Sequence, residues 1–177
     1  GFGSLLYWRG TAAFDTIRIT FPTGTGGVGI DEWSFGNGPA PQPPANDDCA
    51  NASPVNFGSN AIANLLATTS TSGSACGADG ADVWYSYTAT SADDLRFDTC
   101  GSGFDTVLEV YKGTCGALVS EGCNDDACGT GSIVDVIGVN AGDTFLIQIG
   151  GFGGAQGAGN LEIGNPPPPP TPNCVTT

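Results

Sequence analysis

Six of the seven cysteines in this 177-residue chain lie between residues 46 and 163, among short aromatic and β-branched segments separated by glycine. They are Cys49, Cys76, Cys100, Cys115, Cys123 and Cys128. The chain has no histidine, so its cysteines favour disulfides over zinc, because tetrahedral zinc sites usually recruit histidine or paired CxxC motifs. Disulfides persist in oxidising compartments, and the pattern therefore predicts an extracellular or cell-surface protein.

The order of the cysteines does not fix how they pair. Nearest-neighbour pairing joins Cys49 to Cys76, Cys100 to Cys115 and Cys123 to Cys128, but six cysteines allow many connectivities. The middle pair would bracket a hairpin over residues 101–114. Cys174 is left over, and we expect its partner either in residues outside this chain or in a second molecule.

The cysteine-rich region contains seven segments with strand character and turn signals between them. They span residues 60–68, 82–88, 94–99, 106–111, 132–139, 144–149 and 160–164. Alternation is clearest at Phe145, Ile147 and Ile149. Short strands at this spacing predict an all-β jelly-roll or β-sandwich module, with 61–67 as the one place for a helix.

Proline-rich joints divide the chain into three pieces. Residues 1–37 come first, and 38–45 form a Pro-rich linker. The disulfide-stapled sandwich is predicted over 46–164, followed by a polyproline linker and C-terminal tail over 165–177. The run from Pro166 to Pro170 predicts a stiff polyproline II spacer.

The N-terminal piece has the pattern of a separate β-hairpin, with strands over 11–21 and 28–35 around a glycine-rich turn. Its apolar positions are Phe14, Ile17, Ile19, Phe21, Val28, Ile30, Trp33 and Phe35. Two or three strands alone are marginally stable in water. The hairpin is therefore expected to complete a sheet in a neighbouring subunit, or to be the tail of an upstream domain.

The acidic balance excludes several partners. Four Lys and Arg residues against 18 Asp and Glu give a net charge of −14. Phosphate binding needs a cationic patch, so nucleic acid is excluded, and anionic membranes are disfavoured for the same reason. No stretch approaches the roughly 20 apolar residues of a membrane span, so membrane insertion is not expected.

Two matching blocks stand beside cysteines, one at residues 46–49 and one at 124–128. Adjacent carboxylates in such loops supply hard oxygen ligands for Ca²⁺. The predicted ligands are Asp47, Asp48, Asp125 and Asp126. The alternative is structural, since Asn and Asp also close Asx-turns and cap strand ends. No other cofactor is predicted.

The triplet Phe-Asp-Thr occurs at 14–16, 97–99 and 104–106. An Asp beside a half-buried strand predicts a hydrogen-bonded role, such as accepting from backbone N–H groups of a neighbouring loop. Catalysis is not expected. Without histidine, Ser-His-Asp and Cys-His arrangements cannot form, and no pattern fixes two carboxylates at the separation that glycoside hydrolysis needs.

The sequence also offers acceptors for glycans. Asn51 begins an Asn-Ala-Ser sequon. Thr171, in the Thr- and Pro-rich tail, is a candidate for O-linked sugar, as in extended glycosylated stalks.

Several motifs follow one another in a characteristic order. They are residues 46–52 (NDDCANA), 82–87 (DVWYSY), 99–101 (TCG), 104–111 (FDTVLEVY), 123–126 (CNDD) and 141–151 (AGDTFLIQIGG). This set resembles bacterial pre-peptidase C-terminal domains, especially the cysteine-rich form found in secreted or surface proteins of planctomycete-like bacteria. The resemblance implies a non-catalytic jelly-roll sandwich, and some relatives attached to collagenases bind matrix or calcium.

Two functions compete at this point. The first is a structural subunit of an extracellular bacterial fibre or surface layer, in which residues 1–37 add strands to a neighbouring copy. The second is an accessory module of a larger secreted protein that binds carbohydrate or matrix through exposed aromatic residues, namely Trp84, Tyr85 or Tyr111. The partners expected are therefore further copies of the chain or glycans.

Overall fold

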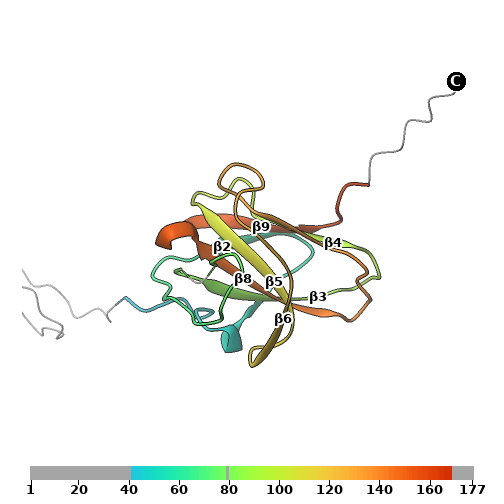
Figure 1. The fold of residues 1–177 in the computed structure, drawn as a ribbon, viewed down its shortest axis with the longest axis horizontal. Coiled ribbons are helices and arrows are strands. Elements are labelled where there is room, and N and C mark those ends of the chain that lie inside the picture. The colour runs from blue at the N-terminus through green and yellow to red at the C-terminus, as the bar shows by residue number, and fades with distance from the viewer. Residues whose placement is uncertain (1–40, 79, 169–177) are drawn as a thin grey trace, which may run out of the picture. The chain divides into compact units, whose positions relative to one another are not determined.

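The computed structural model describes residues 41–78 and 80–168 (Figure 1). The chain divides into two units, Gly1–Gln42 and Pro43–Thr177, and their boundary lies within the predicted linker. The predicted N-terminal hairpin, Thr171 and Cys174 lie outside the described residues.

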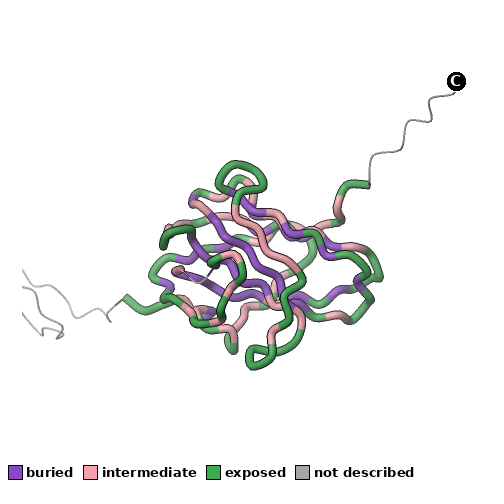
Figure 2. The backbone as a smooth tube through the Cα atoms, in the orientation of Figure 1, coloured by how far each residue is buried: buried purple, intermediate pink, exposed green. Residues whose placement is uncertain are grey.

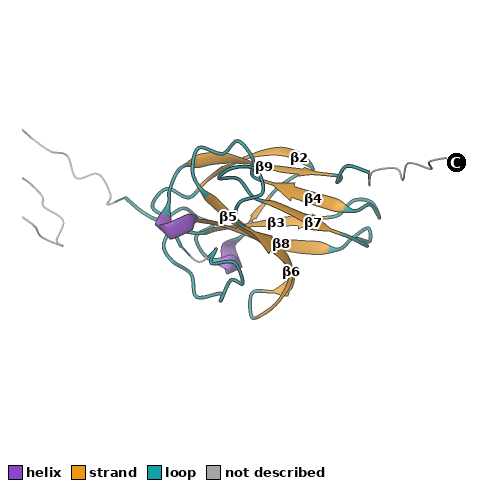
Figure 3. Cartoon of the chain, turned by 45° about the horizontal axis from the view of Figure 1, so that its top comes forward, coloured by secondary structure: helices purple, strands orange, loops and turns teal. Residues whose placement is uncertain are grey.

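The described chain forms two sheets and two short 3₁₀ helices. One sheet has the order β1 (Ser53–Pro54), β3 (Val83–Thr88), β8 (Thr144–Gly151), β5 (Thr106–Thr114) and β6 (Ala117–Asn124). The other has the order β2 (Gly58–Ala63), β9 (Ala158–Gly164), β4 (Leu95–Asp98) and β7 (Ile133–Val136). The helices are η1 (Cys49–Asn51) and η2 (Phe152–Gly154), and Figure 3 shows how little of the module they occupy.

The connections have the order of a jelly roll. From β2 to β9 the chain changes sheet at every connection except the β5–β6 hairpin, and all these strands pair antiparallel. Only the two-residue β1 pairs parallel, with β3. Two sheets of this order form an eight-stranded double Greek key. The predicted all-β sandwich is confirmed.

The core lies between the sheets, as Figure 2 shows by the buried residues along the strands. Its largest fully buried apolar side chains include Phe97, Leu108, Phe145, Ile147, Ile149, Leu161 and Ile163. The Phe97 ring lies 5.7 Å from the Phe145 ring and 6.3 Å from that of Tyr87, centroid to centroid. Burying one such side chain stabilises the fold by about 1.5–3 kcal/mol. The alternation predicted for residues 144–149 is confirmed.

The structure corrects several strand predictions. β6 was not expected, because it is mostly exposed and carries Ser, Glu and Gly; it forms by pairing along β5. The predicted strand over 60–68 ends at Ala63, and Leu66 then adopts φ 64°, which excludes both strand and helix there. β8 continues two residues beyond the predicted strand over 144–149, through Gly150 and Gly151.

The disulfides are Cys49–Cys115, Cys76–Cys123 and Cys100–Cys128, so nearest-neighbour pairing is wrong. The predicted hairpin over 101–114 does not form, because β5 continues through nine residues. Strand geometry carries Cys115 about 30 Å from Cys100, far beyond the reach of a disulfide. The three loops closed have sequence separations of 66, 47 and 28. In the chain-entropy model each is worth about 4 kcal/mol.

Candidate functional site

The outer face of the five-stranded sheet is polar, yet it is buried. Glu109, Gln148 and Trp84 stand in register on β5, β8 and β3, and their exposed fractions are 1%, 0% and 1%. Because side chains alternate between the two faces of a strand, these three point away from the core, while their neighbours such as Leu108 and Ile149 point into it. What covers them is the β2–β3 loop, residues 64–82.

Hydrogen bonds attach this loop to the sheet. The Ser74 hydroxyl and the Ala75 N–H donate to Oε2 of Glu109, at 2.6 and 2.8 Å, and the Ser120 hydroxyl donates to Oε1 at 2.7 Å. The Gln148 amide donates to the Ser72 hydroxyl at 2.9 Å. Buried carboxylates and amides need such partners. The loop therefore functions as a fixed cover.

Asp82 ends the cover at the start of β3 and is fully buried. Its carboxylate accepts from the Ser70 N–H at 2.8 Å and from the Gln148 amide at 3.0 Å. Burial raises the pKa of Asp82, and these hydrogen bonds only partly oppose that rise. The second anchor is covalent, since Cys76 of the loop is bonded to Cys123 of β6.

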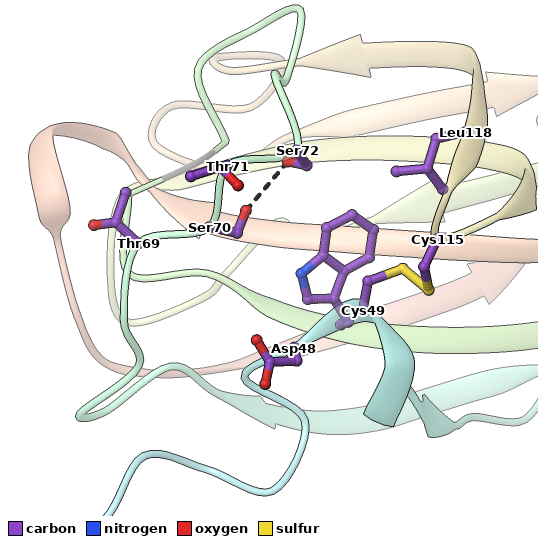
Figure 4. Close-up of a pocket in the computed structure, with 9 residues that line it drawn as sticks. Asp48, Cys49, Thr69, Ser70, Thr71, Ser72, Cys115 and Leu118 are labelled. Atoms are coloured by element: carbon purple, nitrogen blue, oxygen red, sulfur yellow. Dashed lines mark hydrogen bonds between the residues drawn. A yellow bond between two sulfur atoms is a disulfide. The ribbon is translucent and has the colours of Figure 1, made fainter.

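A hollow of about 320 Å³ lies between the cover and the Cys49–Cys115 disulfide. Figure 4 shows the disulfide on one wall and a Ser70–Ser72 hydroxyl pair, 3.2 Å apart, on another. The lining comprises Asp48, Cys49, Thr69, Ser70, Thr71, Ser72, Trp84, Cys115 and Leu118. It is thus formed by four segments distant in sequence, and we call it the Trp84 groove.

Trp84 is held rigidly. Its ring stacks on Tyr111 with the centroids 5.8 Å apart and the planes at 26°. Its backbone N–H donates to the Asn46 carbonyl, and its carbonyl accepts from the Asn46 amide, both at 2.9 Å. Nε1 of the indole is buried and has no hydrogen-bond partner among the described residues.

The predicted aromatic binding platform is wrong. Trp84, Tyr85 and Tyr111 are exposed by only 1%, 6% and 4%. Tyr85 points into the core, and the other two lie beneath the cover. A ligand therefore cannot stack on their faces, although Trp84 lines the groove.

The two Asn-Asp-Asp blocks do not meet. Asp47 accepts from the Thr68 N–H at 2.6 Å and from the Thr68 hydroxyl at 2.7 Å, so the structural alternative describes it. Asp48 is exposed and lines the Trp84 groove; its carbonyl accepts from the Asn51 N–H at 2.8 Å, but its carboxylate makes no hydrogen bond within the described residues. Cys49 ties this block to Cys115, at the far end of β5 from Asp125.

Asp125 and Asp126 instead join Asp105, which precedes β5. One carboxylate oxygen from each lies within 4.8 Å of the others. Oδ1 of Asp105 and Oδ1 of Asp125 are buried without a hydrogen-bond partner. Burial, followed by the charges of Asp126 and Asp105, raises the pKa of Asp125. We call these three residues the Asp105 cluster.

The loops of the Asp105 cluster are fixed by bonds to their neighbours. The Cys100–Cys128 disulfide closes one side. The Thr106 N–H donates to the Thr130 carbonyl at 2.9 Å, and the Ser132 hydroxyl donates to the Asp125 carbonyl at 2.7 Å. The carboxylates therefore cannot separate freely to relieve their repulsion.

Asp105 is not among the predicted Ca²⁺ ligands, although it lies in one of the Phe-Asp-Thr triplets. What brings it to Asp125 is the register of β5 and β6, in which Leu108 pairs with Asn124. The other described triplet behaves as predicted: Asp98 accepts from the Cys100 N–H at 2.6 Å. Asn51 is exposed on η1, and its glycosylation remains a prediction.

No family model and no curated protein matches the chain. Among solved structures, the chain is similar to the pre-peptidase C-terminal domain of collagenase from Bacillus anthracis, known from a 1.0 Å crystal structure. The two share 10% sequence identity, and the TM-score is 0.44. The match covers 64% of this chain and 94% of that domain.

Within the described residues, no helix is long and apolar enough to cross a membrane.

Proposed function

We propose that residues 43–164 form a non-catalytic extracellular module of a secreted or surface protein, and that Ca²⁺ bound by the Asp105 cluster stabilises it. The single observation that carries the proposal is the convergence of three carboxylates, two of which hold a buried oxygen without a donor. Three disulfides support an oxidising compartment.

The electrostatic argument is direct. Buried carboxylate oxygens normally accept hydrogen bonds, and leaving them unpaired costs free energy. Here they also face like charges within 4.8 Å. A divalent cation offsets both costs, and carboxylates are the hard ligands that Ca²⁺ prefers. Asp105, Asp125 and Asp126 would hold the ion, with waters completing its coordination.

The absence of catalysis rests on the chain's chemistry. The whole sequence lacks histidine, so a serine or cysteine nucleophile has no imidazole base. Six cysteines are bonded in pairs. The buried Asp82 and Glu109 are engaged by the cover, which leaves neither of them to a substrate.

Thermal unfolding tests the calcium site. Modules outside the cell bind Ca²⁺ with dissociation constants of about 10⁻⁴ to 10⁻³ M. Calcium at ten times that constant should stabilise the module by about 1.4 kcal/mol, seen as a rise of a few degrees in the melting midpoint. Equal midpoints in calcium and in chelator would discard the proposal.

Asp125→Asn should abolish the response to calcium. Asp48→Asn, in the other block, is the matched control and should keep it. If both variants respond like the wild type, calcium binds elsewhere, and the assignment to the Asp105 cluster fails.

A fibre subunit is the second candidate, and the observation that favours it is the open edge of β6. This strand ends the five-stranded sheet, and Val119 on it is 62% exposed. Open edges accept strands from other chains. The predicted strands of residues 1–37 would be the donor, giving head-to-tail contacts that do not close.

Electron microscopy of native material tests this second candidate. Regular filaments that dissolve on deletion of residues 1–37 support it. Val119→Lys should also dissolve them without lowering the melting midpoint, since a charge on an edge strand opposes strand addition. Monomers alone in the wild type would contradict it.

A further inference from the structure

We infer that the Trp84 groove is a binding site for a neutral, hydroxyl-rich ligand, that is, an oligosaccharide. This goes beyond the calcium proposal, because the groove lies at the other end of β5 and shares no residue with the Asp105 cluster.

The first step concerns the indole N–H of Trp84. The side chain is 1% exposed, and its Nε1 has no acceptor among the described residues. Nearly all buried donors in proteins have a partner, and an exception calls for an explanation. Trp84 lines the groove, so an acceptor outside the chain reaches the N–H from there, directly or through one ordered water.

The second step concerns the groove walls. The Asp48 carboxylate and the hydroxyls of Thr69 and Thr71 are exposed and make no side-chain hydrogen bond within the described part of the chain. The groove walls therefore offer both hydrogen-bond acceptors and donors, while the indole N–H of Trp84 offers only a donor. A hydroxyl group on the ligand can pair with either kind of group, since it accepts and donates at once.

Charge excludes the other chemical classes. An anion would accept from the indole N–H, but it would face Asp48 in a chain of net charge −14. A cation would suit Asp48, but it has no lone pair for the N–H. A purely apolar ligand would leave both groups unpaired. A polyol satisfies every group named.

The groove is also preorganised. The Cys49–Cys115 disulfide holds the wall that carries Asp48, and Asp47 ties the same segment to Thr68 of the cover. Cys76–Cys123 holds the cover itself. Fixing the walls before binding reduces the entropy lost on binding. The volume of about 320 Å³ lies at the lower end of the range for small-molecule sites.

Nuclear magnetic resonance of the ¹⁵N-labelled full chain tests the site. The indole signal that vanishes in Trp84→Phe identifies Trp84; the signals of Trp8 and Trp33 are internal controls. We expect the Trp84 signal to shift saturably with at least one neutral tetrasaccharide among cellotetraose, mannotetraose, xylotetraose and chitotetraose. A heparin tetrasaccharide at the same concentration should leave it unmoved. No shift with any neutral probe overturns the inference.

Variants place the ligand in the groove. Asp48→Ala and Thr71→Val should each weaken binding of the active tetrasaccharide at least tenfold. Glu121→Ala, an exposed carboxylate on β6, is the matched control and should bind as the wild type does. Equal losses in all three variants, or none in Asp48→Ala, would contradict the assignment. Melting midpoints establish that each variant is folded, and titration in chelator separates this site from the calcium proposal.

Discussion

The blocks at 46–49 and 124–128 begin with the same three residues but have become two different sites. In both, the Asn side chain bonds to a backbone group: Asn46 donates to the Trp84 carbonyl at 2.9 Å, and Asn124 accepts from the Ile133 N–H at 3.1 Å. The blocks diverge at the next residue. Asp47 receives two hydrogen bonds from Thr68, whereas Asp125 keeps a buried oxygen without any.

The difference comes from what the fold brings beside each block. Asp47 lies beside the start of the cover, where the N–H and the hydroxyl of Thr68 donate to its carboxylate. Asp125 meets a third carboxylate, that of Asp105. Identical local sequence thus yields a structural tie in one place and a candidate cation site in the other, because partners distant in the chain decide the chemistry.

The largest effects should come from removing the disulfide that secures each block. Cys100→Ser with Cys128→Ser, and Cys49→Ser with Cys115→Ser, should each lower the free energy of unfolding by about 4 kcal/mol. Only the first pair should also lose the calcium response, because it frees the loop of Asp125. Denaturant unfolding with and without calcium measures both quantities. If the calcium response is lost only when the Cys49–Cys115 disulfide is removed, the cation site lies at the first block and not at the second.

Asp47→Ala should have the next largest effect. It leaves the Thr68 N–H and hydroxyl without their acceptor; because Thr68 is exposed, water replaces part of that interaction, and the loss should cost about 1 kcal/mol. Urea unfolding at neutral pH measures the change. Asp47→Asn keeps one side-chain oxygen and should recover part of the loss. If Asp47→Ala leaves the free energy of unfolding unchanged, the hydrogen bonds between Asp47 and Thr68 contribute nothing to stability.

The sequence predicts the sandwich well where one face of a strand is apolar, as at Phe145, Ile147 and Ile149. It fails where burial depends on a distant segment. Gln148 reads as a solvent-facing residue and is fully buried, because a loop more than 60 residues earlier covers it. Two of the three residues of the candidate cation site, Asp125 and Asp126, were predictable from adjacent carboxylates. Asp105 needed the β5–β6 register, which strand propensity does not encode.

Asp125→Asn should act in the opposite direction to Asp47→Ala. In chelator it removes one of three converging charges and should raise the free energy of unfolding, by less than about 1 kcal/mol for a partly exposed group. In saturating calcium the wild type should be the more stable of the two. A variant that is less stable in both conditions would show that Asp125 has a structural role like that of Asp47.

The smallest effect is a dependence on pH. The pKa of Asp125 is raised in the folded state, by burial first and then by Asp126 and Asp105. Protonation therefore favours the folded state: this stabilisation is complete below the ordinary value of 3.8 and is lost as the pH rises through the folded-state pKa. In chelator, the advantage of Asp125→Asn over the wild type should shrink as the pH falls toward 3.8. Asp47→Asn is the control, because the Asp47 carboxylate of the wild type already accepts two hydrogen bonds from Thr68. If the stability advantage of Asp125→Asn instead grows on acidification, the proposed repulsion among the three carboxylates of the Asp105 cluster is wrong.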